Sequence, residues 1–396
     1  MSNSTTKDFF KEQKGKSKVK SEIVVDFFNT YFSILNKTPF SDNGIYYIDL
    51  FSGPGIYEDG TKSTPMEILD VIDNYATDDA VNKIQMVFND ENSSYTNELI
   101  KNIKSHSVYP RLKNQPDVLN QSASQIDLAL YTCSGKPIFS FIDPFGYKDV
   151  SFSQVYELIK PIGSDCILFF NVNRILQDVH KPSSLPYMND IFGSMLDNAF
   201  TVADNPLLNQ KQKGEEFVCL FANNLYHTFF EQFKSKKRYL FVLPFEFESD
   251  LVKKTSHYIL FITKNYKAIT EMKRIMVRNS NSFTTDLCYD EKDLNVISMF
   301  NRSDCIYGEI KAIIIEMLKN SSSLIEKSYN VMDWSEYIDR FSMYKNYTIT
   351  PYTVNEIKET IKKLDNEGRI IINSPIKKKR ITNNTYFSFD KGLIGE

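Results

Sequence analysis

Residues 45–55 read Ile-Tyr-Tyr-Ile-Asp-Leu-Phe-Ser-Gly-Pro-Gly. This stretch is an apolar run that reaches an acidic residue, Asp49, and continues into a loop with two glycines, Gly53 and Gly55. An apolar run without alternation is typical of a strand in a parallel sheet that is covered on both faces. Glycines after such a strand let the backbone approach a ligand at the carboxyl edge of the sheet, where α/β folds bind cofactors. The stretch therefore predicts an α/β fold with a ligand site after its first strand.

The same pattern continues downstream, because short apolar runs alternate with stretches of helical spacing. Two extended runs, 238–250 and 256–263, follow an aromatic-rich helix at 215–233 and predict an antiparallel hairpin. The fold class is therefore α/β, with five parallel-type strands closed by a terminal hairpin. The other strands are expected at 84–89, near 117, at 138–142 and at 166–171, and the other helices at 64–75, 93–104, 122–130 and 153–159.

The two ends of the chain differ from this central pattern. Lysines from Lys7 to Lys20 precede an amphipathic helix, and a solvated charge run is favoured there over a phosphate-binding arm. The C-terminal part reads helix, strand, basic turn, strand, which predicts a winged-helix-like α+β module. We therefore divide the chain into a basic segment with its helix (1–43), an α/β domain (44–300) with an irregular polar insertion near 174–212, and a winged-helix-like domain (301–396).

The composition of the chain excludes several classes of function. The 396 residues include 47 Lys plus Arg against 50 Asp plus Glu, so any contact with nucleic acid must be local rather than a globally basic surface. No apolar run approaches the ~20 residues of a membrane helix and the start resembles no secretory signal, so we expect a cytoplasmic protein without a membrane partner. The five cysteines show no CxxC spacing and the four histidines no HExxH spacing, so neither a disulfide framework nor a metal centre is predicted.

The second strand ends in a candidate ribose-binding site. Asp90, with Glu91 behind it, follows that strand, and a carboxylate there can accept hydrogen bonds from both ribose hydroxyls of a nucleoside cofactor. The sequence has neither GxGxxG nor GxxxxGK[ST], so NAD and ATP are less well supported than S-adenosylmethionine, which has no phosphate. The alternative is an ordinary glycine turn with an acidic cap.

The fourth strand ends in Asp143-Pro144-Phe145-Gly146-Tyr147, on the same predicted edge. An exocyclic amine that attacks a methyl group needs acceptors to orient its lone pair, and a flat base needs an aromatic ring to stack on. Asp143 and the Pro144 carbonyl could be those acceptors, and Phe145 or Tyr147 the stacking face. The alternative is a strand-terminating Asp-Pro turn with aromatics packed beneath it.

Two further groups are candidates for substrate binding. Asn171, Asn173 and Arg174 follow the fifth strand and could hydrogen-bond a substrate, although such residues also cap helices. Lys377, Lys378, Lys379 and Arg380 could grip a phosphate backbone from a wing, although a solvated hairpin tip or a protein-docking module fits the pattern too.

These motifs together resemble a known family. DLFSGPG with Thr64-Pro65, FIDPFGY, FFNVNR, HYILFITKNYKAITEMKRIM and the leading helix KVKSEIVVDFFNTYFSIL look like the bacterial three-Cys-motif partner protein family over most of residues 16–280. Its members are regarded as class I methyltransferase-like proteins with a Rossmann-like sheet, encoded beside a three-cysteine protein that resembles radical-S-adenosylmethionine enzymes. The resemblance implies a reaction centre at Asp143 and Pro144 and a cofactor pocket formed by Asp49, Phe51, Ser52, Gly53, Pro54, Gly55 and Asp90.

One departure separates two hypotheses. Amino-methyltransferases carry [DNS]PP[YFW], whereas Phe145 replaces the second proline here and Gly146 precedes the aromatic Tyr147. The leading hypothesis is an S-adenosylmethionine-dependent methyltransferase that acts on a base nitrogen of nucleic acid, with the C-terminal module holding the polymer. The rival is a non-catalytic or conditionally active partner subunit of the three-cysteine protein in a defence or modification operon.

Overall fold

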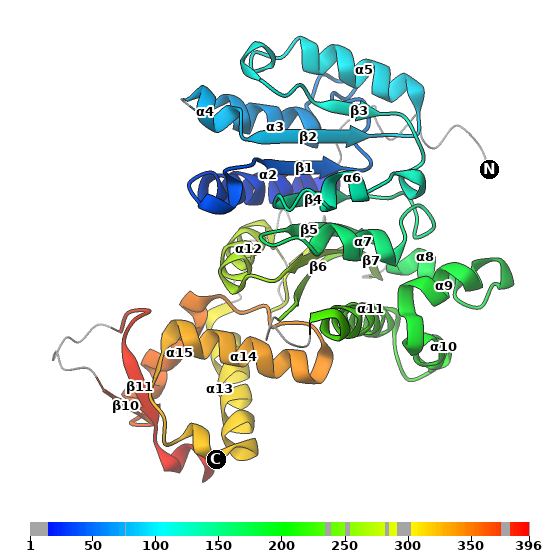
Figure 1. Cartoon of the computed structure of the whole chain (residues 1–396). Helices are drawn as coiled ribbons and strands as arrows, with labels where there is room; N and C mark the ends of the chain where they lie inside the picture. The colour runs from blue at the N-terminus through cyan, green and yellow to red at the C-terminus, as the bar shows by residue number, and fades with distance from the viewer. Residues whose placement is uncertain are drawn as a thin grey trace.

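The computed structural model describes residues 15–75, 77–233, 239–249, 254–281, 285–290, 302–373 and 381–395. Within these residues one eight-stranded sheet has the order β3-β2-β1-β4-β5-β7-β6-β8, and Figure 1 shows its strands stacked from β3 at the top downwards. Its strands are β1 (Ile45–Asp49), β2 (Ile84–Asn89), β3 (Asp117–Leu119), β4 (Ile138–Ile142), β5 (Asp165–Phe170), β6 (Phe241–Ser249), β7 (Lys254–Thr263) and β8 (Cys288–Tyr289).

The sheet is mostly parallel. Strands β1 to β5 pair in parallel, β7 is antiparallel to both β5 and β6, and β8 adds a short parallel strand beside β6. The predicted α/β class and the predicted hairpin of β6 and β7 are confirmed. The strand β7 lies inside the sheet, because it pairs with β5 and β6 on its two sides.

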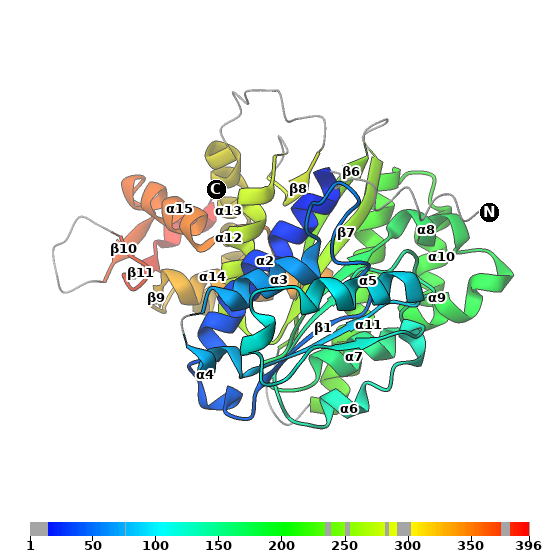
Figure 2. The ribbon, with the colours of Figure 1, turned by 90° about the horizontal axis from the view of Figure 1, so that it is seen from above.

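Both faces of the sheet are buried around its central strands, which explains why β1, β2, β4 and β5 are largely apolar. Alternate side chains of a strand point to opposite faces. Ile45 and Tyr47 belong to a core with α2, α3, α5 and α12, whereas Ile48 belongs to a core with α7, α9 and α11. In Figure 2, α2, α3 and α5 accordingly lie on one side of β1 and α6 and α7 on the other.

The helices around the sheet begin at recognisable caps. Asn92, Asn171 and Asn265 cap α5, α8 and α12 through their side chains, and Ser151 with Gln154 forms a capping box at α7. The helices are α2 (Gly15–Leu35), α3 (Thr64–Asp73), α4 (Asp78–Val81), α5 (Ser93–Lys104), α6 (Ala129–Thr132), α7 (Phe152–Ile159), α8 (Val172–Asp178), α9 (Leu185–Phe192), α10 (Leu196–Asp204), α11 (Gln210–Phe233) and α12 (Tyr266–Asn279). The 3₁₀ turns among them are η1 (Pro39–Ser41), η2 (Tyr109–Arg111), η3 (Ala123–Gln125), η4 (Pro182–Ser184) and η5 (Gly193–Met195).

Two local predictions were wrong. The segment 174–212, expected to be irregular, contains most of α8 together with α9 and α10, because each short helix buries apolar residues such as Met188, Phe192 and Ala199 against the rest of the domain. The segment 122–130, expected to be one helix, is split into η3 and the start of α6, because the Asp127 side chain accepts the Ala129 N–H and starts a new turn.

The C-terminal part builds a core of its own. Trp334 is fully buried in it, among apolar residues drawn from positions 306 to 394. Three helices pack there against a three-stranded antiparallel sheet with the order β10-β11-β9, drawn in yellow to red in Figure 1. Its elements are α13 (Arg302–Asn320), η8 (Ser322–Leu324), β9 (Tyr329–Asn330), α14 (Val331–Asn346), α15 (Val354–Asn366), β10 (Ile370–Ile372), β11 (Tyr386–Phe389) and η9 (Lys391–Gly395).

A buried ion pair joins this part to the α/β domain. Lys273 of α12 and Asp339 of α14 lie 2.6 Å apart with side chains 1% and 0% exposed.

None of the helices in the described residues is both long and apolar enough to cross a bilayer.

Candidate functional site

Three loops are tied together where β1, β2 and β3 end. Asn89, the last residue of β2, is buried, and its side-chain amide donates hydrogen bonds to the carbonyls of Leu50 and Gln121, each at 3.0 Å. Ser52 donates through its backbone N–H and its Oγ to the Asn89 carbonyl, at 2.8 and 3.0 Å. These bonds hold the loop after β1 in a fixed position at the carboxyl edge of the sheet.

The two glycines of this loop have different roles. Gly53 adopts a φ of +62° and donates its N–H to Asp90 Oδ2 at 3.0 Å, while Asp90 Oδ1 accepts the Asn92 N–H at 2.9 Å. Burial raises the pKa of Asp90, and these two backbone bonds oppose that rise. Gly55, with a φ of +84°, faces the core, because a Cβ there would lie 2.7 Å from Leu99 Cδ1. The first glycine therefore holds the predicted ribose carboxylate, and the second permits close packing.

A cavity of about 200 Å³ opens beside this loop. Residues from both predicted clusters line it, although the clusters are distant in the sequence: Asp49, Phe51, Ser52 and Asp90 from the cofactor cluster, and Asp143, Pro144 and Phe145 from the acceptor cluster. The remaining wall comes from Ser17, Lys20, Tyr57, Ser63, Thr64, Pro65, Phe141 and Phe169.

Asp49 is the most deeply buried carboxylate of the cavity wall. Its Oδ1 accepts the Phe51 N–H at 3.0 Å, whereas its Oδ2 is buried with no hydrogen-bond partner in the described residues. Burial raises the pKa of Asp49 to about 8, and the Phe51 bond only partly offsets this effect. A ligand that brings a hydrogen-bond donor or a cation into the cavity would satisfy this oxygen.

Asp143 is already paired. The Lys20 ammonium of α2 lies 2.6 Å from Asp143 Oδ2, and the two side chains are only 10% and 22% exposed. The same ammonium sits 4.3 Å from the centre of the Phe169 ring, in cation–π geometry. The predicted acceptor carboxylate therefore faces a lysine from the N-terminal helix.

The aromatic residues near the cavity fall into two groups. Phe145 is 54% exposed at the cavity rim, where a flat ligand could stack on it. Phe169 lies inside, between Lys20 and the ring of His257, whose centroid is 4.2 Å away. Burial lowers the pKa of His257 well below its usual value, so this imidazole is neutral.

Several predicted site residues do not line the cavity. Tyr147 donates its hydroxyl proton to Asp178 Oδ2 and is hydrogen-bonded to Ser184 Oγ, both at 2.8 Å, and so is anchored to the segment 174–212. Burial raises the pKa of Tyr147 to about 12. The others that lie outside the cavity wall are Gly53, Pro54, Gly55 and the exposed Glu91.

Asn171, Asn173 and Arg174, predicted to bind substrate, do not line the cavity either. Asn171 accepts the Arg174 N–H at 3.1 Å and caps α8, which is the alternative anticipated for it. Asn173 accepts a hydrogen bond from Gln210, and the Arg174 side chain is exposed. Lys377, Lys378, Lys379 and Arg380 lie outside the described residues.

Sequence reasoning missed Lys20 and Asn89 as site residues. The sequence does contain a signal for Asn89, because a polar residue at the end of an apolar strand must find hydrogen-bond partners at the sheet edge. The sequence contains no such signal for Lys20, which is one lysine in a basic run. Only the packing of α2 on the sheet brings it to Asp143, 123 residues away.

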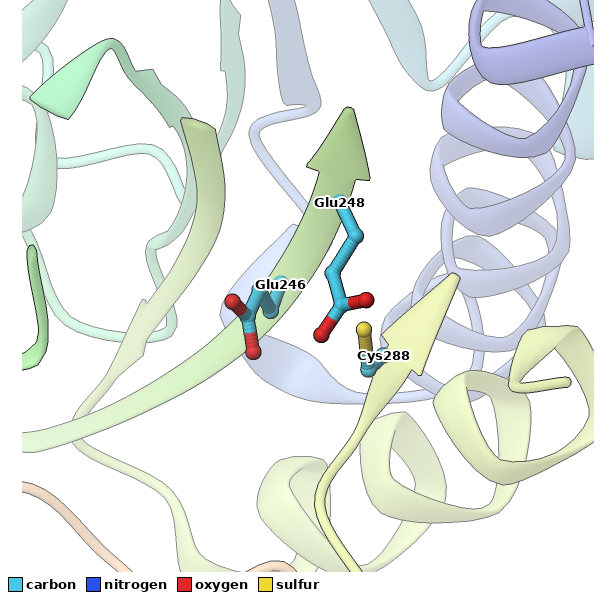
Figure 3. Close-up of side chains that lie close together, drawn as sticks. All are labelled: Glu246, Glu248 and Cys288. Carbon is cyan, nitrogen blue, oxygen red and sulfur yellow. The ribbon is translucent and has the colours of Figure 1, made fainter. Parts of the chain in front are cut away.

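A second cluster lies at the far edge of the sheet. Figure 3 shows Glu248 of β6 pointing toward Cys288 of β8, with Glu246 nearby on the same strand, and the potential ligand atoms of the three residues lie within 4.8 Å of one another. The Lys211 ammonium is 2.9 Å from Glu246 Oε2 and 3.7 Å from Glu248 Oε1, and burial raises the pKa of the Cys288 thiol. Lys211 thus supplies the positive charge that a metal would bring, and the thiol stays protonated.

Comparisons with known proteins add little to this geometry. No family model matches the sequence. No curated protein matches it either. Among solved structures, protein LPL1258 from Legionella pneumophila, titled with the family model DUF519, aligns over 65% of this chain and 90% of that one, with 12% identity and a TM-score of 0.37. So distant a likeness carries no conclusion about fold or function.

Proposed function

We propose that this chain binds S-adenosylmethionine at the carboxyl edge of its sheet and transfers the methyl group to a nitrogen acceptor, with nucleic acid as the expected substrate class. The observation that carries the proposal is the cavity wall shared by Asp49, Asp90 and Asp143. The resemblance to the three-Cys-motif partner family supports it, because a sheet of parallel strands with an antiparallel hairpin is the arrangement that a class I methyltransferase-like fold requires.

Asp90 and Asp49 would bind different parts of the cofactor. Asp90 is held by two backbone N–H groups and keeps lone pairs for the two ribose hydroxyls. An ammonium of the cofactor beside Asp49 would favour the ionised form of this acid, whose unsatisfied Oδ2 would then accept its hydrogen bond. The cavity is smaller than the ~300 Å³ at which ligand pockets usually begin, so we expect part of the ligand to lie over the open rim at Phe145. Bound there, the cofactor would supply an electrophilic methyl group.

The C-terminal part supports the nucleic-acid half of the proposal. We propose that α13, α14, α15, β10 and β11 form a winged-helix-like module, and that the basic residues 377–380 add salt-dependent contacts to a phosphate backbone. The affinity of wild type for nucleic acid would then fall steeply as the salt concentration rises. In a chain with all four basic residues replaced by Ser, the affinity would depend much less on salt.

Calorimetric titration with S-adenosylmethionine tests the cofactor site. We expect binding heat in wild type and at least about tenfold weaker binding in Asp90→Ala, because the ribose hydroxyls lose a charged acceptor. Glu91→Ala is the matched control: this neighbouring carboxylate is exposed and outside the cavity wall, so its affinity should stay within about twofold. The absence of both heat and a thermal shift at millimolar cofactor would defeat the proposal.

One observation favours a second candidate, the non-catalytic or conditionally active partner subunit. Lys20 already occupies Asp143, the residue expected to orient an acceptor amine. Transfer of a tritiated methyl group to total DNA and RNA separates the two candidates. Transfer by wild type that is lost in Asp143→Ala supports catalysis, whereas cofactor binding without transfer to either polymer, together with copurification of a three-cysteine protein, supports the partner subunit.

A further inference from the structure

The Lys20 ammonium lies where the proposed reaction would place its acceptor nitrogen. It is 2.6 Å from Asp143 Oδ2, the oxygen expected to orient an amine, and it lines the same cavity as Asp49 and Asp90. An aromatic ring, Phe169, faces it at 4.3 Å. Aromatic faces of this kind bind alkylated ammonium groups well, so the site suits a methylated lysine as well as a free one.

Helix α2 holds this lysine firmly. Phe27 packs edge-on against Phe261 at 4.6 Å, and Phe28 packs against Tyr47 at 5.3 Å, so the helix is anchored to the central strands. The helix is also held by a hydrogen bond that the Tyr31 hydroxyl donates to the Gly163 carbonyl at 2.9 Å. Lys20 is therefore part of the folded cavity wall, and an external amine could reach Asp143 Oδ2 only by breaking a short ion pair.

We propose that Lys20 is itself a methyl acceptor of this chain, an inference that rests on the proposed binding of S-adenosylmethionine. The Lys20 ammonium gives one proton to Asp143 Oδ2, and the nitrogen lone pair then attacks the methyl carbon. The N–C bond forms as the S–C bond breaks, and the electron pair of the broken bond remains on sulfur as a thioether. Asp143 releases its proton to solvent. The products are methyl-Lys20 and the demethylated cofactor.

Mass spectrometry of the full chain tests this directly. The protein as isolated, and again after incubation with S-adenosylmethionine, should carry a mass increase of one CH₂ per methyl group, mapped to Lys20 by digestion with a protease that does not cleave at lysine. Lys18→Arg is the matched control, because Lys18 lies on the same helix with a 65% exposed side chain, and its variant should be modified like wild type. Lys20→Arg should gain no mass.

Calorimetry separates this inference from the proposed function. The titration is repeated on Lys20→Arg, and the mass assay of this variant is run at a cofactor concentration that saturates it. With a circular dichroism spectrum that matches wild type, a missing mass gain then reports the lost acceptor rather than lost binding or misfolding. Cofactor binding by wild type with no methyl group on Lys20 in either sample would overturn the inference alone. Absence of binding would overturn both it and the proposed function, and a mass gain that persists in Lys20→Arg would place the acceptor elsewhere.

Discussion

Two lysine–aspartate pairs in this chain have the same length and different surroundings. Lys273 and Asp339, and Lys20 and Asp143, are each joined at 2.6 Å. The first pair is almost fully buried between α12 and α14, whereas the second lines a cavity. Nitrogen–oxygen distance alone therefore does not tell a structural ion pair from one at a candidate site.

The two pairs differ in how many hydrogen-bond donors surround the carboxylate oxygens. Both oxygens of Asp339 are occupied: Oδ2 also accepts from Tyr266 at 2.8 Å, and Oδ1 accepts from the N–H and the hydroxyl of Thr350 at 3.1 and 2.6 Å. Asp143 accepts a hydrogen bond from Lys20 and, within the described part of the chain, from no further protein donor. A saturated carboxylate positions the chain, while an unsaturated one at a cavity can still receive a ligand.

The largest effect is expected from Asp339→Ala. This change leaves the Lys273 ammonium buried without its counter-charge, and breaking a buried pair from one side costs about 3–5 kcal/mol. Burial already lowers the pKa of Lys273, and Asp339 opposes that shift. Denaturant unfolding followed by Trp334 fluorescence should show the loss, with Asp365→Ala, an exposed carboxylate on α15, as the control. An equal loss in both variants would contradict the assigned role of burial.

Much of the sheet could be predicted from the sequence, because its strands are buried on both faces and so appear as continuous apolar runs. The runs 84–89 and 138–142 match β2 and β4 to the residue, and the helix 93–104 matches α5. Their caps and apolar spacing are local signals, which one stretch of sequence contains in full.

The errors and the omissions have a different cause. Helices α9 and α10 are short and individually weak, and they are stabilised by packing that local pattern does not reveal. The two carboxylate clusters could be predicted to share an edge, because parallel strands end there together. The Lys20–Asp143 pair could not, because it depends on how α2 docks on the sheet.

Asp49 extends the comparison to a cavity carboxylate without a lysine. Its pKa is raised from 3.8 to about 8, so between these values the folded state holds a proton that the unfolded state has lost. Stability from this group is full below the unfolded pKa and falls by about 1.4 kcal/mol per pH unit as the pH rises towards 8. We expect wild type to lose roughly 3 kcal/mol relative to Asp49→Asn between mildly acidic and neutral pH.

Parallel thermal or denaturant melts of wild type and Asp49→Asn across this pH range provide the measurement. Other buried carboxyls, such as Asp165, whose pKa burial raises to about 7, are present in both proteins and cancel in the difference. A constant difference between the two proteins at every pH would show that Asp49 does not titrate abnormally.

Lys20→Met should cost less than Asp339→Ala. Methionine keeps the stem of the side chain against Phe169, and the partly accessible Asp143 regains water, so we expect a loss of about 1–3 kcal/mol. Equilibrium unfolding in denaturant measures it. A loss as large as that of Asp339→Ala would mean that the cavity pair is a structural element like its buried counterpart.

The smallest effect is expected at a third lysine–acid pair, Lys345 of α14 with Glu316 of α13, whose side chains are each 45% exposed. The pair lies in the same module as Asp339, so module and charge type are held constant while burial changes. Water and salt screen exposed pairs, and Lys345→Ala should therefore change the free energy of unfolding by less than about 1 kcal/mol, with a still smaller change at high salt. Denaturant unfolding at two salt concentrations checks this. A loss comparable to that of Asp339→Ala would show that proximity of charges, rather than burial with saturated oxygens, determines the strength of these pairs.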